Sequence, residues 1–203
     1  DLSRISIMLS QIQPHFLYNS LVGIKQLCDT DPQRASDALE HFSYYLRGNL
    51  DSLSNTGLIP FEKELDHIED YLYLEKMRYG ERLRIRWEIG YQDFMLPPLT
   101  LQPIVENAVR YGITQKKAGG SLTIRSGQAD GSVVITVVDD GVGFDISEKK
   151  EDGRTHIGLE NVRDRLDAMC GGRLEVKSEI GTGTEIKLIL PQRRNRVNEN
   201  YSG

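Results

Sequence analysis

The sequence predicts an α+β protein in which a helical N-terminal region is followed by an α/β region. Up to about residue 80, apolar residues recur at three- and four-residue spacing, which indicates helices with an apolar side. Beyond Gly80, apolar and charged residues alternate and glycine pairs interrupt the pattern, as in strands and turns. We therefore expect a helical region over residues 1–80, an α/β domain over 81–191 and a polar tail over 192–203.

The helical region divides at two prolines. Apolar residues from Ile5 to Phe16 line one side of a first helix, and Pro14 within it should kink or restart that helix. Asp31-Pro32 is a cap and first-turn signal for a second helix over residues 33–53. A third helix is expected over residues 62–78. Helices with apolar residues on more than one side usually pack against another chain or domain.

The α/β region has a regular alternation of strand and helix signals. Helices are expected over residues 100–111 and 161–169. Five strands are expected, over residues 83–89, 121–126, 132–138, 173–178 and 184–190.

Composition excludes several classes of function. The chain of 203 residues has a net charge of −5, and its Lys and Arg residues are scattered among carboxylates, which argues against nucleic acid as a partner. Cys28 and Cys170 lack metal-ligand spacing, so we expect buried, reduced thiols. The longest apolar run, 133–138, is too short to span a bilayer. Because the chain opens at Asp1 inside an expected helix and without Met, we expect a fragment of a longer protein.

The expected helix over 100–111 carries polar side chains suited to a metal-bound phosphate. Asn107 and Arg110 are three residues apart and are expected to share a face. An amide oxygen suits Mg²⁺ and a guanidinium suits phosphate. An ordinary surface helix carrying the same residues is the alternative interpretation.

Asp139 ends an apolar strand and is followed by Gly141 and Gly143. A carboxylate at this position can accept a hydrogen bond from the exocyclic amine of adenine, and the glycines let the backbone approach a flat base. A plain acidic turn is the alternative.

Two glycine-containing strings follow. Gly158-Leu159 comes after a polar stretch and is expected to open a helix whose N-terminal amides hold phosphate. Gly181-Thr182-Gly183-Thr184 then starts the final strand, and a turn without ligand contact explains it nearly as well.

In this order and spacing, the motifs over about residues 96–191 resemble the GHKL ATP-binding superfamily of gyrases, heat-shock chaperones, histidine kinases and mismatch-repair ATPases. The resemblance implies a Bergerat-type α/β sandwich, whose mixed sheet is covered by helices on one face, with Mg-ATP as ligand. It implies that Asn107 ligates Mg²⁺ and that Asp139 binds adenine. It places the following residues around the nucleotide: Arg110, Tyr111, Gly141, Gly143, Gly158, Leu159, Gly181, Thr182, Gly183 and Thr184.

The chain departs from that pattern in two places. Residues 154–156 stand where the superfamily has further glycines upstream of Gly158. Members that hydrolyse ATP carry a Glu one helical turn before the metal-binding Asn, and here that position is Pro103, which cannot act as a base. Glu106 abuts Asn107 but lies roughly 100° around the helix from it. The site therefore favours transfer to another acceptor over hydrolysis.

A candidate acceptor lies near the N-terminus. Gln11, His15 and Asn19 fall on one side of a helix at four-residue spacing. An unperturbed imidazole is mostly neutral at pH 7 and can attack a γ-phosphoryl group, while flanking amides orient its ring. The alternative is a structural histidine. Three further histidines lack this context and are expected to be structural or surface residues: His41, His67 and His156.

The string from Pro14 to Asn19 closely resembles the H box of the sensor histidine kinases typified by LytS and YesM. The match continues through residues 60–64 and 71–78 and so spans nearly the whole chain. It implies autophosphorylation of His15 and transfer to an Asp of a response-regulator receiver domain. It also implies a homodimer formed through the helices of residues 2–53, and a membrane-anchored parent with a cytoplasmic kinase core.

The proton acceptor for His15 is not given by the resemblance. Other histidine kinases have a carboxylate directly after the acceptor, where this chain has Phe16, and Glu106 is the remaining candidate. Two further functions stay open from the sequence. One is a degenerate module that binds nucleotide or dimerises without kinase activity, and the other is an ATP hydrolase.

Overall fold

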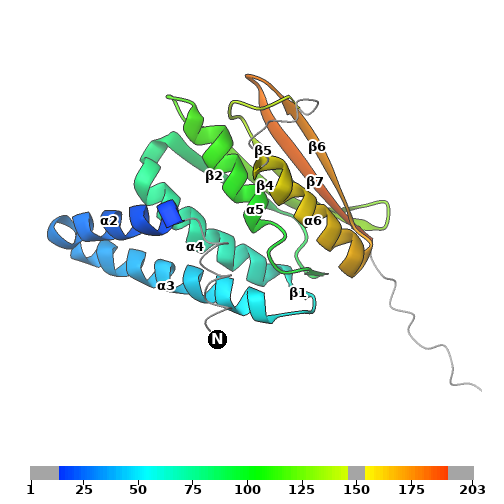
Figure 1. Cartoon of the computed structure of the whole chain (residues 1–203), viewed down its shortest axis with the longest axis horizontal. Coiled ribbons are helices and arrows are strands. Elements are labelled where there is room, and N and C mark those ends of the chain that lie inside the picture. The colour runs from blue at the N-terminus through cyan, green and yellow to red at the C-terminus, as the bar shows by residue number, and fades with distance from the viewer. Residues whose placement is uncertain (1–13, 146–153, 192–203) are drawn as a thin grey trace, which may run out of the picture.

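The computed structural model describes residues 14–145 and 154–191. Three long helices form its helical part, α2 (Pro14–Thr30), α3 (Pro32–Ser54) and α4 (Phe61–Tyr79) (Figure 1). The second and third helices predicted from the sequence are confirmed. The expected helix before Pro14, Gln11 included, lies outside the described residues.

Local signals account for the ends of these helices. The carboxylate of Asp31 accepts a hydrogen bond from the N–H of Arg34 at 3.1 Å, which caps α3 as the sequence predicted. Helix α4 is followed by Gly80 as its C-cap. The positive φ of Gly80, 55°, turns the chain toward the strand that begins at Leu83.

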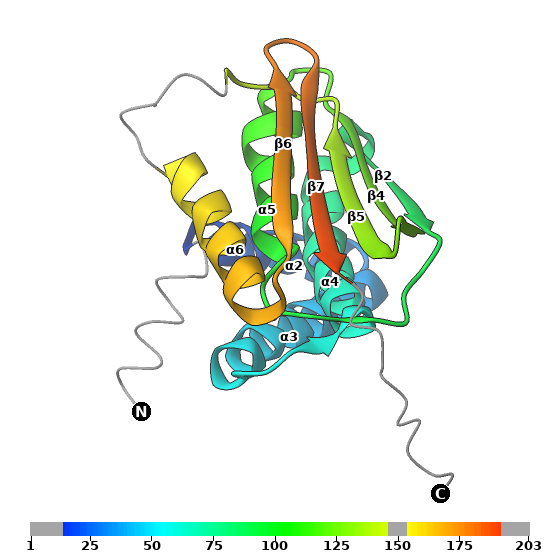
Figure 2. The same cartoon turned by 90° about the vertical axis from the view of Figure 1, so that its right-hand side faces the viewer.

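A five-stranded mixed sheet forms the α/β part, as expected. Its strands are β2 (Leu83–Ile89), β4 (Gly120–Ala129), β5 (Ser132–Asp139), β6 (Arg173–Glu179) and β7 (Gly183–Pro191). They lie in the order β2-β4-β5-β7-β6; the β2–β4 pair is parallel and the other pairs are antiparallel. Figure 2 shows α5 (Gln102–Asn107) and α6 (Arg154–Cys170) on one face of this sheet.

Two predicted helix boundaries were wrong. The helix expected over 100–111 is regular only to Asn107 and continues as a wider, π-helical turn over Ala108–Gly112. Helix α6 begins at Arg154, so Gly158 lies inside it and does not open it. Gly158 has no left-handed φ, so nothing in its backbone marks a helix boundary.

A second, two-stranded sheet had no counterpart in the sequence prediction. Strand β1 (Ile59–Pro60) pairs antiparallel with β3 (Met95–Leu96). Segments this short carry no readable alternation. The pairing holds the start of α4 beside the segment that leads into α5.

The core is continuous across the two parts of the chain. Buried apolar side chains from Phe16 on α2 to Leu190 on β7 belong to one packed cluster. The division at residue 80 stays a prediction, because the helical and α/β parts share this cluster. Within the described residues, every helix is too short or too polar to cross a membrane.

Candidate functional site

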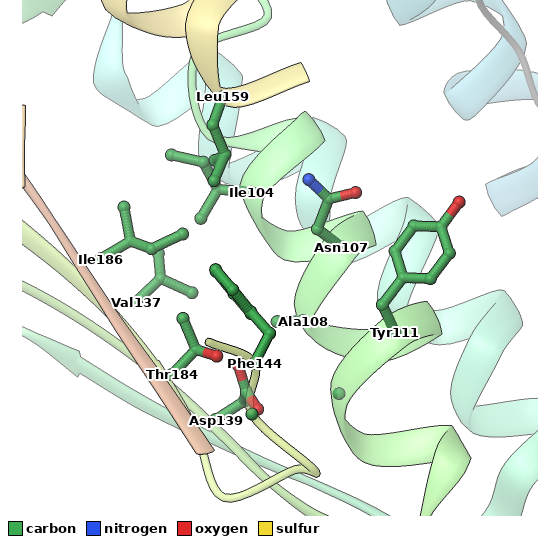
Figure 3. A pocket seen from close by; sticks show the side chains of 12 residues that line it. Ile104, Asn107, Ala108, Tyr111, Val137, Asp139, Phe144, Leu159, Thr184 and Ile186 are labelled. Atoms are coloured by element: carbon green, nitrogen blue, oxygen red, sulfur yellow. The ribbon is translucent and has the colours of Figure 1, made fainter. Parts of the chain in front are cut away.

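A cavity of about 40 Å³ lies between α5 and the sheet (Figure 3). Its lining combines apolar side chains from both layers with a few polar groups: Ile104, Asn107, Ala108, Tyr111, Gly112, Val137, Asp139, Gly143, Phe144, Leu159, Thr184 and Ile186. Apolar walls with few polar groups are typical of small-molecule sites.

Asp139 lies at the end of β5 and points into the cavity beside Thr184 (Figure 3). It is 5 % exposed, and burial raises the pKa of its carboxyl to about 6. One oxygen accepts a hydrogen bond from the N–H of Gly141 at 2.9 Å, which opposes that rise. The site thus holds a desolvated hydrogen-bond acceptor against apolar walls.

Phe144 is a cavity residue that the sequence reasoning missed. Its ring lies between α5 and the side chains of Val137 and Ile186 (Figure 3). The remaining space holds only a few water molecules. The sequence signal that could have identified Phe144 is its position directly after Gly143, where the backbone passes close to another segment.

The glycines after Asp139 allow backbone segments of the chain to approach one another closely. A Cβ on Gly141 would lie 2.3 Å from the carbonyl carbon of Gly112, and one on Gly143 would lie 2.0 Å from the carbonyl oxygen of Glu179. A Cβ on Gly183 would lie 2.0 Å from the carbonyl oxygen of Asp139. These contacts fix the segment that carries Asp139 between α5 and the β6–β7 turn.

Asn107 and Tyr111 line the rim of the cavity on the same side of the helix (Figure 3). Arg110 does not line it: the side chain is exposed and lies over the Tyr111 ring at 4.9 Å. Asn107 thus lines the cavity, whereas Arg110, in the π-helical turn, does not. The phosphate role of Arg110 stays a prediction.

Helix α6 also contributes to the cavity lining, close to Asn107. Leu159 lines the cavity, and a Cβ on Gly158 would lie 3.6 Å from the amide nitrogen of Asn107. Of the four residues in the last glycine string, Thr184 lines the cavity, whereas Gly181 and Thr182 are exposed in the β6–β7 turn.

His15 lies in the first described turn of α2 and is exposed. The amide nitrogen of Asn19 is 2.9 Å from its Nδ1, so the expected pairing of these two side chains is present. The neighbouring Phe16 is buried, with its ring 4.9 Å from that of Tyr45. The third member of the predicted set, Gln11, lies outside the described residues.

Glu106 faces the helical part of the chain. Its carboxylate accepts hydrogen bonds from the Tyr45 hydroxyl at 3.2 Å and from the Gln102 amide at 2.7 Å. It does not line the cavity, and among the described residues that do, Asp139 is the only carboxylate. Glu106 is therefore not placed at the cavity as a water-activating base. The proposed proton transfer from His15 to Glu106 stays a prediction.

The donor set fits a nucleotide-bound Mg²⁺ better than a free metal ion. No group of three or more His, Cys, Asp and Glu side chains within the described ranges could hold a metal. Mg²⁺ commonly takes one or two protein oxygens and completes its shell with phosphate oxygens and water. The amide oxygen of Asn107 at the rim suits that limited role.

Two family models match different parts of the chain. Residues 3–83 match the family described as "Histidine kinase". Residues 98–194 match the family described as "Histidine kinase-, DNA gyrase B-, and HSP90-like ATPase".

Similar proteins cover nearly the whole chain. YwpD of Bacillus subtilis (strain 168) is 36 % identical over 194 residues, which is 92 % of this chain and 69 % of that protein. "Sensor protein LytS" of Bacillus anthracis is 31 % identical over 203 residues, which is 94 % of this chain. The chain spans 34 % of the length of that LytS.

A solved structure shares the fold. The histidine kinase domain of the Erythrobacter litoralis EL346 blue-light activated histidine kinase superposes with a TM-score of 0.53 at 15 % identity, over 87 % of this chain and 92 % of that domain. The match of both halves to kinase families, together with the LytS similarity, shows that the chain belongs to the sensor histidine kinases of the LytS type.

Proposed function

We propose that the chain is a kinase core that binds Mg-ATP in the cavity under α5 and transfers the γ-phosphoryl group to His15. The observation that supports it most is the cavity itself, where the buried carboxylate of Asp139 faces apolar walls and Asn107 stands at the rim. The same chain presents an exposed imidazole oriented by Asn19.

Each residue has a defined task in this proposal. Asp139 would accept a hydrogen bond from the exocyclic amine of adenine. Asn107 would provide one oxygen ligand to Mg²⁺, which would neutralise phosphate charge. An unprotonated ring nitrogen of His15 forms the new P–N bond as the bond to the ADP oxygen breaks. Phosphoryl transfer of this kind depends mainly on positioning and charge neutralisation.

Incubation with γ-labelled ATP and Mg²⁺ tests this proposal. We expect acid-labile, base-stable label on the protein, its loss in His15→Gln and its loss in Asp139→Asn. His41→Gln is the matched control, because His41 lies on α3 and pairs with Asp70. Label that survives His15→Gln contradicts the assignment of the acceptor. Steady phosphate release that survives it supports a hydrolase instead.

The partners and setting follow from the family and are also proposed. We infer that phosphorylated His15 passes its phosphoryl group to an Asp of a response-regulator receiver domain, and that two copies pair through α2 and α3. We also infer that the parent protein is membrane-anchored with this core in the cytoplasm. Transfer of label to a purified receiver domain encoded beside the parent gene tests the first of these proposals.

A further inference from the structure

The segment that leads into α5 has an unusual backbone. Leu99 has a positive φ of 56°, a conformation that costs energy for a residue other than glycine. Thr100 and Leu101 follow it and are fully buried. No side chain of its own caps the start of α5, so the N–H groups here need partners from elsewhere in the fold.

Glu64 on α4 provides those partners. Its carboxylate accepts hydrogen bonds from the N–H groups of Leu99 at 2.6 Å, Thr100 at 3.1 Å and Leu101 at 2.7 Å. Glu64 is 2 % exposed, so no water competes for these bonds. In its ionised form this carboxylate also interacts favourably with the positive end of the α5 dipole.

Arg165 on α6 holds the same segment from the other side. Its guanidinium donates to the carbonyl oxygens of Pro98 and Leu99, both at 2.8 Å. The N–H groups of the segment are therefore bound by α4 and its carbonyl groups by α6. Both charged side chains fix one strained turn.

This turn leads directly into α5 and is held by Arg165 of α6, and both helices contribute residues to the cavity lining. Asn107 of α5 and Leu159 of α6 both line the cavity. A change in how the turn is held is therefore expected to change the position of α5 relative to α6.

We propose that Glu64 is a positioning residue for nucleotide binding, acting with Arg165 to fix α5 against α6. The inference rests on the proposed nucleotide site. It adds that the helical part of the chain, through α4, sets the geometry of that site. Neither side chain lines the cavity, so the effect passes through the turn between them.

Titration of each protein with a fluorescent ATP analogue and Mg²⁺ tests the proposal. Glu64→Gln keeps the shape but places an amide N–H₂ against backbone N–H donors, so we expect the Kd to rise about tenfold. Glu62→Gln is the matched control. Glu62 lies two residues before Glu64 on α4 and is exposed, so this variant should bind the analogue as wild type does. Circular dichroism and cooperative thermal unfolding establish that each variant is folded. The rate of labelling at saturating ATP should fall less than the KM for ATP rises.

Arg165 supplies a second pair of variants. Arg165→Gln should weaken binding as Glu64→Gln does, and Arg165→Lys should restore part of it, because an ammonium still donates to the two carbonyl groups. Where wild type binds and both Glu64→Gln and Arg165→Gln bind equally well, the positioning role is wrong while the proposed function stands. Where wild type itself binds no analogue, both proposals fall. Where Glu64→Gln does not fold, the Arg165 variants decide. An affinity of Arg165→Gln for the analogue that equals that of wild type overturns the inference.

Discussion

Glycines in this molecule differ in what surrounds them, and the difference is open to experiment. A Cβ on Gly141 would lie 2.3 Å from the backbone of Gly112 and 2.6 Å from an oxygen of Asp139. A Cβ on Gly127, in strand β4, would meet nothing within 4 Å. The first glycine is required by a close approach at the site, and the second is not.

We predict that Gly141→Ala displaces the Asp139 carboxylate and lowers affinity for an ATP analogue at least tenfold, because the Gly112 backbone cannot retreat without moving α5. Titration of the analogue measures this effect. Gly127→Ala is the control and should change the free energy of unfolding by less than about 1 kcal/mol, since its site accepts a methyl group. Equal binding by the two variants would contradict the role of the Gly141 contact.

Among the elements, α3 and α5 are joined by one buried phenol. The Tyr45 hydroxyl donates to Glu106 and accepts a bond from the Gln102 amide at 3.3 Å. Its ring also packs against Phe16 on α2 and stacks on His67 of α4 at 5.2 Å. Burial raises the pKa of Tyr45 above its ordinary value, so the hydroxyl stays protonated and can donate.

We predict that Tyr45→Phe destabilises the protein by about 1–2 kcal/mol, because it removes the donor that Glu106 accepts from while leaving the ring. Urea unfolding followed by circular dichroism measures this loss. Tyr44→Phe is the matched control on the same helix. Its hydroxyl bonds Glu40 at an exposed position, so its removal should change stability little. Equal losses for the two variants would show that burial of the Tyr45 bond is unimportant.

The sequence predicted elements well where their periodicity was long. The cap at Asp31 and all five long strands are confirmed within a few residues. The π-helical turn after Asn107 was not predicted, because hydrophobic spacing does not distinguish it from an α-helical turn. The pairing of Glu64 with Leu99–Leu101 was also beyond reach, since it joins residues far apart in sequence.

In the candidate site, too, residues in short sequence motifs were predicted, and residues that only the fold brings together were not. Asp139, Asn107 and Leu159 were chosen from local strings, and the fold brings all three to one cavity. Phe144 and the apolar walls were missed, because Val137 and Ile186 become neighbours only through strand pairing. Arg110 was expected around the same site and does not line the cavity.

Across the whole molecule, buried carboxyl groups make stability depend on pH. Burial raises the pKa of Glu64 and of Glu75 to about 7 and that of Asp139 to about 6. In the unfolded chain these groups ionise at lower pH, so the folded state binds more protons between about pH 4.5 and 7. The free energy of unfolding contributed by these groups therefore falls as pH rises through that window and is constant above it.

Glu75→Gln should reduce that dependence. We predict that the variant is more stable than wild type at pH 8, by on the order of 1–3 kcal/mol, and that the gain shrinks toward pH 5. Urea unfolding at the two values of pH measures it. Glu81→Gln, whose side chain is 97 % exposed, is the control and should show no such difference. A gain that is equal at both pH values would exclude ionisation of Glu75 as its cause.

Exposed apolar side chains on α2 and α3 allow a test of the proposed dimer. Leu21 is 51 % exposed and Leu39 is 50 % exposed, each on a helix of the proposed pairing surface. We predict that Leu21→Glu combined with Leu39→Glu converts a dimer to a monomer in light scattering, since buried charges without partners are costly. Ile180→Glu is the control, because Ile180 is 70 % exposed in the β6–β7 turn. A dimer that persists in the double variant would place the interface elsewhere.

The parallel pairing of β2 with β4 has a consequence for how the chain reaches its native state. Parallel neighbours require a crossover connection, and here the intervening residues include the whole of α5 and its π-helical turn. Closing so long a loop delays contact formation, whereas α2, α3 and α4 are joined by short connections and can associate early. During refolding we therefore expect helical signal to appear before the fluorescence of Trp87, the one tryptophan, reaches its native value, because Trp87 lies on β2.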